Sequence, residues 1–326
     1  MHRRLALLSL SALAAGGLLL PAAPAGAAPK TAPPAEEEAA DTRAEQRQVL
    51  DYWTPSKMAN AQPLAAPAPR PPAGNGQGEP GQPNGTRWTA PPTDPQATVS
   101  TGNPWTKGGQ VVRTTGRVFF TYQGRNASCS GSAVTSANKS VVITAGHCVK
   151  LGGAFHTNWV FVPGYDNGQR PYGTWVATKL ITTPQWNARE DINYDIAAAV
   201  VAPQQGRSLT DVVGGQGVAF NQPRRQQMYA FGYPAAAPYN GSKLIYCAGR
   251  AFDDFLLSRD HGLTCNMTGG SSGGPWLVGF DESTGHGTVN SVNSFKYNFA
   301  PNWMFGPYFG NEAQAVYNEA QSTGAA

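Results

Sequence analysis

Gly270-Ser271-Ser272-Gly273-Gly274-Pro275 is the stretch of this sequence that says most about its fold. The small residues around Ser272 predict a turn that exposes one hydroxyl and lets the backbone curl around an incoming carbonyl. Upstream, Thr144-Ala145-Gly146-His147-Cys148 follows an apolar run, so the end of a rigid strand could present the histidine. Together the two stretches predict a serine nucleophile, a histidine base and an oxyanion hole.

The third member of this constellation is expected at Asp195. It stands directly before the apolar run Ile196–Val201, which is typical of a buried strand. A carboxylate fixed there would accept the Nδ1–H of the histidine, set its tautomer and stabilise the imidazolium. Asp191 is the main competitor, but it does not adjoin the strand.

The surrounding sequence is typical of an all-β domain. From Val111 onward, short β-branched and aromatic runs alternate with Gly, Asn and Pro turns. The expected strands include 117–122, 129–134, 140–144, 159–162, 173–181, 196–201, 227–231 and 244–246. One helix is expected at the end, Asn311 to Gln321, with Asn311 as a candidate N-cap.

The N-terminus predicts export. His2, Arg3 and Arg4 precede an apolar run from Leu5 to Leu20, and Ala25-Gly26-Ala27 fits a cleavage site. Residues 1–27 are therefore interpreted as a signal peptide, and the mature protein is expected to be secreted, extracellular and free of the membrane. A membrane anchor is the weaker alternative, because the apolar run is shorter than the ~20 residues needed to span.

Residues 28–105 differ sharply in composition from the rest. Pro29 to Pro104 contain 15 of the 27 prolines, without the alternation that implies a packed core. We interpret this region as a low-complexity, largely disordered propeptide or linker, whose boundary could lie anywhere from about 70 to 110. One charged island, Glu36 to Met58, could form a helix that covers the active site, which makes the propeptide a candidate inhibitor.

The four cysteines favour disulfides in an exported chain. Cys129 and Cys148 are close in sequence, as are Cys247 and Cys265. The local pairs Cys129–Cys148 and Cys247–Cys265 are the simplest of three connectivities, each worth ~3 kcal/mol in the chain-entropy model. Metal binding is the alternative, but neither Cys-x-x-Cys nor His-Glu-x-x-His occurs.

Charge and pattern exclude several partners. The formal net charge of +4 is spread without basic blocks, so no nucleic-acid partner is expected. No heptad or large apolar stripe indicates oligomers, so a monomer is expected. His156, His261 and His286 lack a partner pattern and are expected in surface or loop roles.

The three motifs occur in the order His147, Asp195, Ser272, and in this the chain resembles the chymotrypsin/trypsin-like serine endopeptidases, particularly their secreted bacterial branch. The resemblance spans about residues 111–326. It implies two packed six-stranded antiparallel β-barrels, here 106–205 and 206–326, the second followed by the terminal helix. It also implies that the substrate, a peptide or protein, binds in the crevice between the barrels.

The resemblance implies roles for each matching residue. His147 would deprotonate Ser272, which attacks the scissile carbonyl to give an acyl-enzyme, while Asp195 orients His147. The amides of Gly270 and Ser272 would form the oxyanion hole, and no cofactor or metal is needed. Ser271 departs from the aspartate of animal digestive members, so activation by a buried new N-terminus is in doubt. In this respect the chain resembles bacterial glutamyl endopeptidases.

Specificity is expected to depend on the second barrel. By resemblance, Asn266 lies at the pocket base, where a carboxylate would be needed for strict Arg or Lys preference. The segment Val292–Lys296 resembles the strand that pairs with substrate, with a main-chain bond from Ser294 and with Phe295 in the pocket wall. Thr268 and Asn293 could support an acidic side chain, so glutamate is the candidate preference.

Two other functions compete. Gly270-x-Ser272-x-Gly274 also fits the nucleophile elbow of an α/β-hydrolase esterase, although that fold needs Ser before Asp before His and strand–helix alternation. A binding protein on an inactive protease scaffold is the second, opposed by the presence of all three catalytic residue types.

Overall fold

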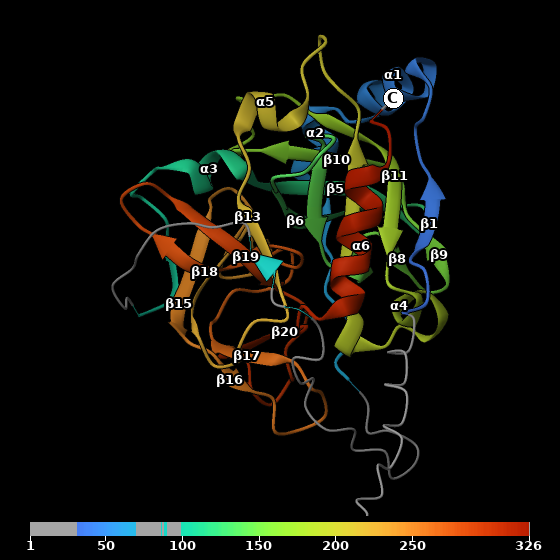
Figure 1. Cartoon of the computed structure of the whole chain (residues 1–326). Helices are drawn as coiled ribbons and strands as arrows, with labels where there is room; N and C mark the ends of the chain where they lie inside the picture. Colours follow the sequence, from blue (N-terminus) through green and yellow to red (C-terminus); the bar gives the residue numbers. More distant parts are fainter. Residues whose placement is uncertain (1–30, 70–85, 87, 90–98, 326) are drawn as a thin grey trace, which may run out of the picture. The chain divides into compact units, whose positions relative to one another are not determined.

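The computed structural model describes residues 31–69, 86, 88–89 and 99–325 (Figure 1), so the predicted signal peptide lies outside the described part. Every described residue belongs to one compact unit, Thr31–Ala326. Most described elements are strands, as expected for an all-β domain. Among the described residues, none of the helices has the length and apolar character that crossing a bilayer requires.

Six strands of the first half close into a barrel. In ring order they are β5 (Thr115–Tyr122), β6 (Arg125–Ala133), β7 (Val141–Thr144), β12 (Ala197–Val201), β11 (Trp175–Thr182) and β10 (Thr157–Pro163). All six pairings are antiparallel, and β10 pairs with β5 to close the ring. The interior is filled by side chains such as Val118, Ile143 and Val160, all fully buried. The predicted six-stranded barrel is confirmed for this half.

The second half is less regular than the predicted second barrel. A seven-stranded sheet contains β3 (Trp88–Thr89), β13 (Gly217–Phe220), β19 (His286–Val292), β18 (Pro275–Asp281), β14 (Gln227–Gly232), β15 (Ile245–Arg250) and β4 (Ser100–Pro104). A three-stranded sheet contains β16 (Phe252–Asp253), β17 (His261–Thr264) and β20 (Trp303–Gly306). Strands β15 and β17 contact each other without a hydrogen-bonded ladder, and β13 joins β19 in parallel.

Two disulfides are present, and they are the local pairs that the spacing favoured. Cys129, on β6, is bonded to Cys148 in the short 3₁₀ helix η1 (Gly146–Cys148), which carries His147. Cys247, on β15, is bonded to Cys265, which follows β17. The second bridge therefore joins the two sheets at the place where a ladder is missing.

Short helices and hairpins complete the fold. They are α3 (Gln110–Thr114), α4 (Pro184–Arg189), α5 (Leu209–Val213), the 3₁₀ helix η2 (Ile192–Tyr194), and the hairpin of β8 (Lys150–Leu151) and β9 (Ala154–Phe155). The terminal helix α6 (Asn311–Ser322) buries Ala313, Val316, Tyr317 and Ala320, a helical spacing that packs one face on the first barrel. Its N-cap is Gly310 rather than the expected Asn311, which is the first helical residue.

Residues 31–69, inside the region expected to be largely disordered, form defined elements. These are β1 (Ala35–Glu38), α1 (Arg43–Tyr52), α2 (Pro55–Ala59) and β2 (Gln62–Pro63). Figure 1 shows β1 beside β11, with which it pairs antiparallel, and β2 pairs with β6. Thr42 and Glu45 form a capping box at the start of α1. The helix expected within Glu36–Met58 is thus confirmed only in part, because Glu36–Glu38 belong to a strand and the rest contains two separate helices.

The compositional boundary near residue 105 does not coincide with a structural one. Strand β4 pairs with β15, and the buried Trp105 packs edge-on against Phe231, Tyr246 and Phe280. The composition places residues 100–104 in the low-complexity region, whose boundary it leaves open between about 70 and 110, and they belong to the second-half sheet. This edge strand has few apolar residues, and the large ring of Trp105 fills the core beside it.

Replacing Trp105 with alanine should lower the free energy of unfolding by about 3–5 kcal/mol, because a large buried ring is lost. Val99→Ala, at an exposed side chain of the same region, should change it by less than about 0.5 kcal/mol. Denaturant unfolding of the full chain measures both. Equal effects of the two substitutions would mean that residues 99–105 are a removable linker.

Candidate active site

His147 and Asp195 are brought together by two neighbouring strand ends. Strand β7 ends at Thr144 and β12 begins at Ala197, and these two residues are paired in the antiparallel register. The turn that follows β7 and the turn that precedes β12 therefore lie side by side. His147 belongs to the first turn and Asp195 to the second.

The Asp195 carboxylate holds His147 with two hydrogen bonds. Asp195 Oδ1 accepts from the backbone N–H of His147 at 2.7 Å, and Oδ2 lies 2.8 Å from His147 Nδ1. Oδ2 also accepts the hydroxyl hydrogen of Ser294. Both His147 and Asp195 have zero exposed side-chain surface. An imidazole fixed in this way directs its Nδ1–H at the carboxylate, which leaves Nε2 unprotonated and able to accept a proton.

Gly146 permits this close approach. A Cβ at this position would lie 2.9 Å from Asp195 Oδ1 and 2.8 Å from Trp186 Cγ. Any side chain at residue 146 would therefore displace either the carboxylate or the Trp186 ring. The glycine before the histidine is thus required by packing around the carboxylate.

The Gly270–Pro275 turn lies against the strand end that carries His147. Gly270 and Gly273 have φ values of +95° and +78°, which only glycine adopts readily. A Cβ on Gly273 would lie 2.0 Å from Thr144 Oγ1 and 2.8 Å from the Ala145 nitrogen. The turn is therefore packed against Thr144 and Ala145, which precede His147 by two or three residues.

The expected hydrogen bond between Ser272 and His147 is not formed. Ser272 Oγ instead lies 3.3 Å from the carbonyl oxygen of Leu64 and donates to it. His147 Nε2 is buried and has no hydrogen-bond partner among the described residues. Ser272 and His147, the predicted nucleophile and base, are therefore not hydrogen-bonded to each other, and the Leu64 carbonyl of the N-terminal region accepts the Ser272 hydroxyl hydrogen.

The predicted oxyanion-hole donor Gly270 is also engaged by Leu64. The Gly270 N–H donates to the Leu64 carbonyl oxygen at 3.2 Å. The carbonyl of Ser272 accepts from the Ser130 N–H at 2.7 Å, and Ser130 Oγ donates to the Gly270 carbonyl. Ser130 therefore supports the turn from the first barrel. Sequence reasoning missed this role, because no local pattern distinguishes Ser130 from other strand serines.

The five predicted substrate-binding residues fall into two groups. Asn293 is fully buried, and its side chain is used internally: Nδ2 donates to the carbonyls of Phe231 and Ser271, and Oδ1 accepts from Trp276. It therefore supports the Ser272 turn from behind. Ser294 donates its hydroxyl hydrogen to Asp195, a contact that the sequence did not predict.

Asn266, Thr268 and Phe295 make different contacts. Asn266 Oδ1 accepts from Tyr239 Oη at 2.5 Å, and Thr268 Oγ1 donates to the Ala236 carbonyl at 2.6 Å. Phe295 is buried in an aromatic cluster, stacked on Phe305. In the described part of the chain, the polar side chains at 266 and 268 are thus already hydrogen-bonded to protein groups.

His156 and His261 are buried, contrary to the expected surface or loop roles. His156 stacks on Phe120 with ring centroids 4.4 Å apart, and its Nε2 lies 2.9 Å from the His147 carbonyl. His261 has neither ring nitrogen hydrogen-bonded within the described residues. Burial lowers the pKa of His156 to about 4 and that of His261 to about 3. Both are therefore neutral at pH 7, and His156 supports the backbone of the His147 turn.

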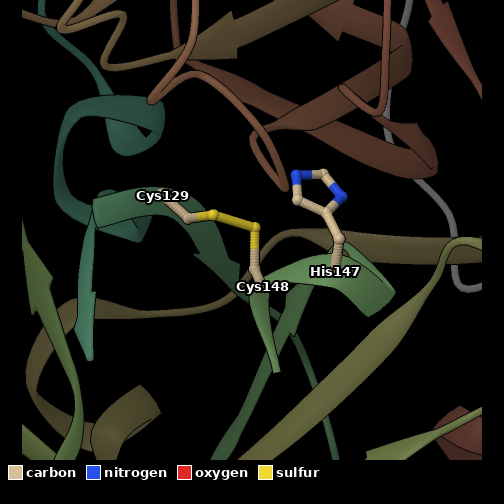
Figure 2. Close-up of side chains that lie close together, drawn as sticks. All are labelled: Cys129, His147 and Cys148. Atoms are coloured by element: carbon tan, nitrogen blue, oxygen red, sulfur yellow. A yellow bond between two sulfur atoms is a disulfide. The ribbon is translucent and has the colours of Figure 1, made fainter. Parts of the chain in front are cut away.

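One group of metal-ligand side chains lies at this site. Cys129, His147 and Cys148 are close together (Figure 2), and within the described ranges they form the one such group of three. The two sulfurs are bonded to each other and His147 Nδ1 faces Asp195, so neither thiolate nor a free Nδ1 is offered. The donor set therefore does not fit a metal ion.

The protein is similar to solved bacterial proteases. The protease Anisep from Arthrobacter nicotinovorans is 47% identical, with 65% of this chain and 96% of that chain covered and a TM-score of 0.62. The thermostable serine protease AL20 from an extremophilic microorganism is 46% identical, with 66% and 99% covered and a TM-score of 0.62. A Glu endopeptidase shares the fold at 15% identity and a TM-score of 0.53, with 70% and 99% covered. No family model and no curated protein matches the chain.

The identity and coverage of the first two relatives, together with the closed barrel, define the class of this protein. The chain belongs to the bacterial trypsin-like serine proteases, and it is therefore a hydrolase that acts on peptide or protein substrates.

Acid should destabilise the fold through the two buried histidines. Between pH 6.5 and about 4 the unfolded chain protonates both residues while the folded chain does not, so stability is lost as pH falls through this range. Each histidine lowers the free energy of unfolding by about 1.4 kcal/mol for each pH unit of acidification in this range. Between pH 6.5 and 5, the free energy of unfolding of the His261→Phe variant should therefore fall by about 2 kcal/mol less than that of the unmodified protein. His286→Gln, at an exposed histidine, is the control, and urea unfolding at each pH gives the values.

Proposed function

We propose that Ser272, His147 and Asp195 are the catalytic triad of a secreted serine endopeptidase. The observation that carries the proposal is the buried His147–Asp195 pair, joined by two hydrogen bonds and adjoining the Ser272 turn. A carboxylate in this arrangement stabilises the imidazolium that forms when His147 takes a proton. The paired cysteines agree with an oxidising compartment and hence with secretion.

The reaction follows from these positions. With the crevice open, the Ser272 hydroxyl turns to His147 Nε2, which takes its proton as Oγ attacks the scissile carbonyl. The N–H groups of Gly270 and Ser272 stabilise the negative oxygen of the tetrahedral intermediate. His147 then protonates the leaving amine, and the acyl-enzyme is hydrolysed by a water that His147 activates in the same way.

We further propose that the N-terminal region is a propeptide that keeps the secreted protein inactive. Its described part, residues 31–69, reaches Ser272 through Leu64. The mature enzyme would retain β4, since this strand belongs to the second-half sheet.

The triad is tested after every variant has been treated with the same external protease to remove the N-terminal region. Asp195→Asn should lower kcat for a peptide substrate by about 10⁴-fold, because it favours the wrong imidazole tautomer. Ser272→Ala should lower it on the order of a millionfold and abolish labelling by a serine-directed phosphonate. Asp191→Asn is the matched control and should retain activity. Full activity of Ser272→Ala, or a peptide-binding protein that never cleaves, would overturn the proposal.

Glutamate is the proposed preference for the residue before the scissile bond, and Lys296 supports it. The Lys296 ammonium donates to the carbonyl of Cys265 at 2.9 Å and to that of Pro301. Cys265 adjoins Asn266, which the family resemblance places at the pocket base. No carboxylate forms an ion pair with Lys296 among the described residues, and burial lowers the pKa of Lys296 to about 8. A desolvated cation there repels Arg and Lys side chains and attracts a carboxylate.

Lys296→Gln should therefore lower kcat/KM for a glutamyl peptide about 10–100-fold relative to its glutaminyl analogue, the loss expected for a charge-assisted hydrogen bond. The Glu/Gln ratio of the unmodified enzyme should fall as the pH rises through about 8, because Lys296 then loses its charge. Lys139→Gln, at an exposed lysine, is the control. Equal cleavage after Glu and Leu would dismiss the preference.

A further inference from the structure

The chain just after α2 lies in the proposed catalytic crevice. Gln62 and Pro63 run beside Ala127 and Ser128 of β6, and the Leu64 N–H donates to the Ser128 carbonyl at 2.9 Å. The Leu64 carbonyl then accepts from the Gly270 N–H and from Ser272 Oγ. The Leu64 carbonyl thus accepts hydrogen bonds from both the oxyanion-hole donor and the nucleophile of the proposed mechanism.

Beyond Leu64, Ala65 is exposed and Ala66 is buried. Ala66 is buried in a cluster formed by residues of both halves. The other buried members of this cluster are Leu151, Trp186, Ile192, Phe295, Tyr297 and Phe305. The chain therefore runs from β6, past Ser272, into the buried cluster to which Phe295 also belongs.

This path is opposite to that of a substrate. In the proposed function the residue before the scissile bond enters the pocket beside Asn266 and Phe295, so the acyl half of a substrate lies on the Phe295 side. The leaving half then lies on the β6 side. A substrate runs from the Phe295 side to the β6 side, whereas residues 62–66 run from β6 to Phe295. The parallel pairing of β2 with β6 agrees with this direction of residues 62–66.

Reversal explains how the segment can fill the site and remain intact. The Ala65 nitrogen, which would be the leaving group of the Leu64 carbonyl, lies toward the acyl side rather than the leaving side. Moreover, Ser272 donates its hydrogen to the Leu64 oxygen, and His147 Nε2 is left without a partner. A hydroxyl that donates to the carbonyl oxygen is not poised to transfer its proton to His147.

We infer that residues 62–66 are a reversed plug, which inhibits the protease without being a substrate and must dissociate before the site works. The inference rests on the proposed function of Ser272 and His147. A cut anywhere between Ala66 and Ser100 would separate the plug from the enzyme covalently but would leave it bound.

The anchors of the plug are extensive. Strand β1 extends the first barrel beyond β11, and Lys179 of β11 forms ion pairs with Glu36 and Glu38. Trp53 is 2% exposed, packs on Phe119 and donates its indole N–H to a carbonyl of β10. The N-terminal region is thus held by an added strand and by a docked helix. The surface of the first barrel therefore fits this segment of the same chain.

The test uses the full chain and compares two glutamate substitutions in neighbouring residues. Ala66→Glu places a charge in the buried cluster and should expel the plug, whereas Ala65 is exposed and Ala65→Glu should leave it in place. We expect Ala66→Glu to raise the initial rate of Ser272 labelling by a serine-directed phosphonate at least tenfold. Ala65→Glu should label as slowly as the unmodified chain. Trp53→Ala, with exposed Leu50→Ala as control, provides a second pair that acts through the anchor.

Mass spectrometry of the same samples tests the direction. The Leu64–Ala65 bond should stay intact in the unmodified chain, including after an external protease has cut beyond residue 66. A fragment ending at Leu64 that appears in the unmodified chain but not in Ser272→Ala would show a forward-running substrate and overturn the plug. Rapid and equal labelling of all variants would also overturn it. If Ala66→Glu and Trp53→Ala are neither labelled nor active even after residues 31–69 have been removed completely, the proposed function of Ser272 and His147 fails.

Discussion

The rest of the site depends on the hydrogen bonds that the buried Asp195 carboxylate accepts. A charge with no exposed surface is tolerated only when hydrogen bonds replace its water. Two of its donors come from His147 on the first barrel and one from Ser294 in the second half. The carboxylate therefore orients the imidazole and ties the two halves together at the same point. The absence of a side chain at Gly146 leaves the room that this arrangement needs.

In the proposed plug, one residue, Leu64, forms hydrogen bonds with the polar groups of the catalytic crevice. Leu64 provides an acceptor for Gly270 and Ser272 and a donor for Ser128, so a bound segment leaves these groups paired. His147 Nε2 is the exception, and a buried polar atom without a partner costs about 1–3 kcal/mol. That cost favours the return of the Ser272 hydroxyl to His147 once Leu64 has left. In the proposed mechanism, the Ser272 hydroxyl donates to Leu64 in the inhibited protein and to His147 in the active one.

Much of the fold followed from local patterns, and the exceptions have physical causes. Short β-branched and aromatic runs predicted an all-β domain, and the family resemblance implied the closed first barrel that is found. Close spacing favoured the two disulfides that are present. The high proline content did not indicate that residues 31–69 are packed. A few buried side chains, such as Val49, Trp53 and Met58, are enough to hold this segment on a barrel that already exists. His156 was expected near the surface, since a sequence does not show that Phe120 would stack on it.

The sequence by itself determined the class of chemistry, because a serine between glycines, a histidine after a strand and an aspartate before one are each local requirements of a turn. The tertiary structure alone decided which groups meet. The link from Ser294 to Asp195, the support of the Ser272 turn by Ser130 and Asn293, and the position of Leu64 join residues far apart in the chain. Such contacts depend on register and chain direction, which local residue patterns do not specify.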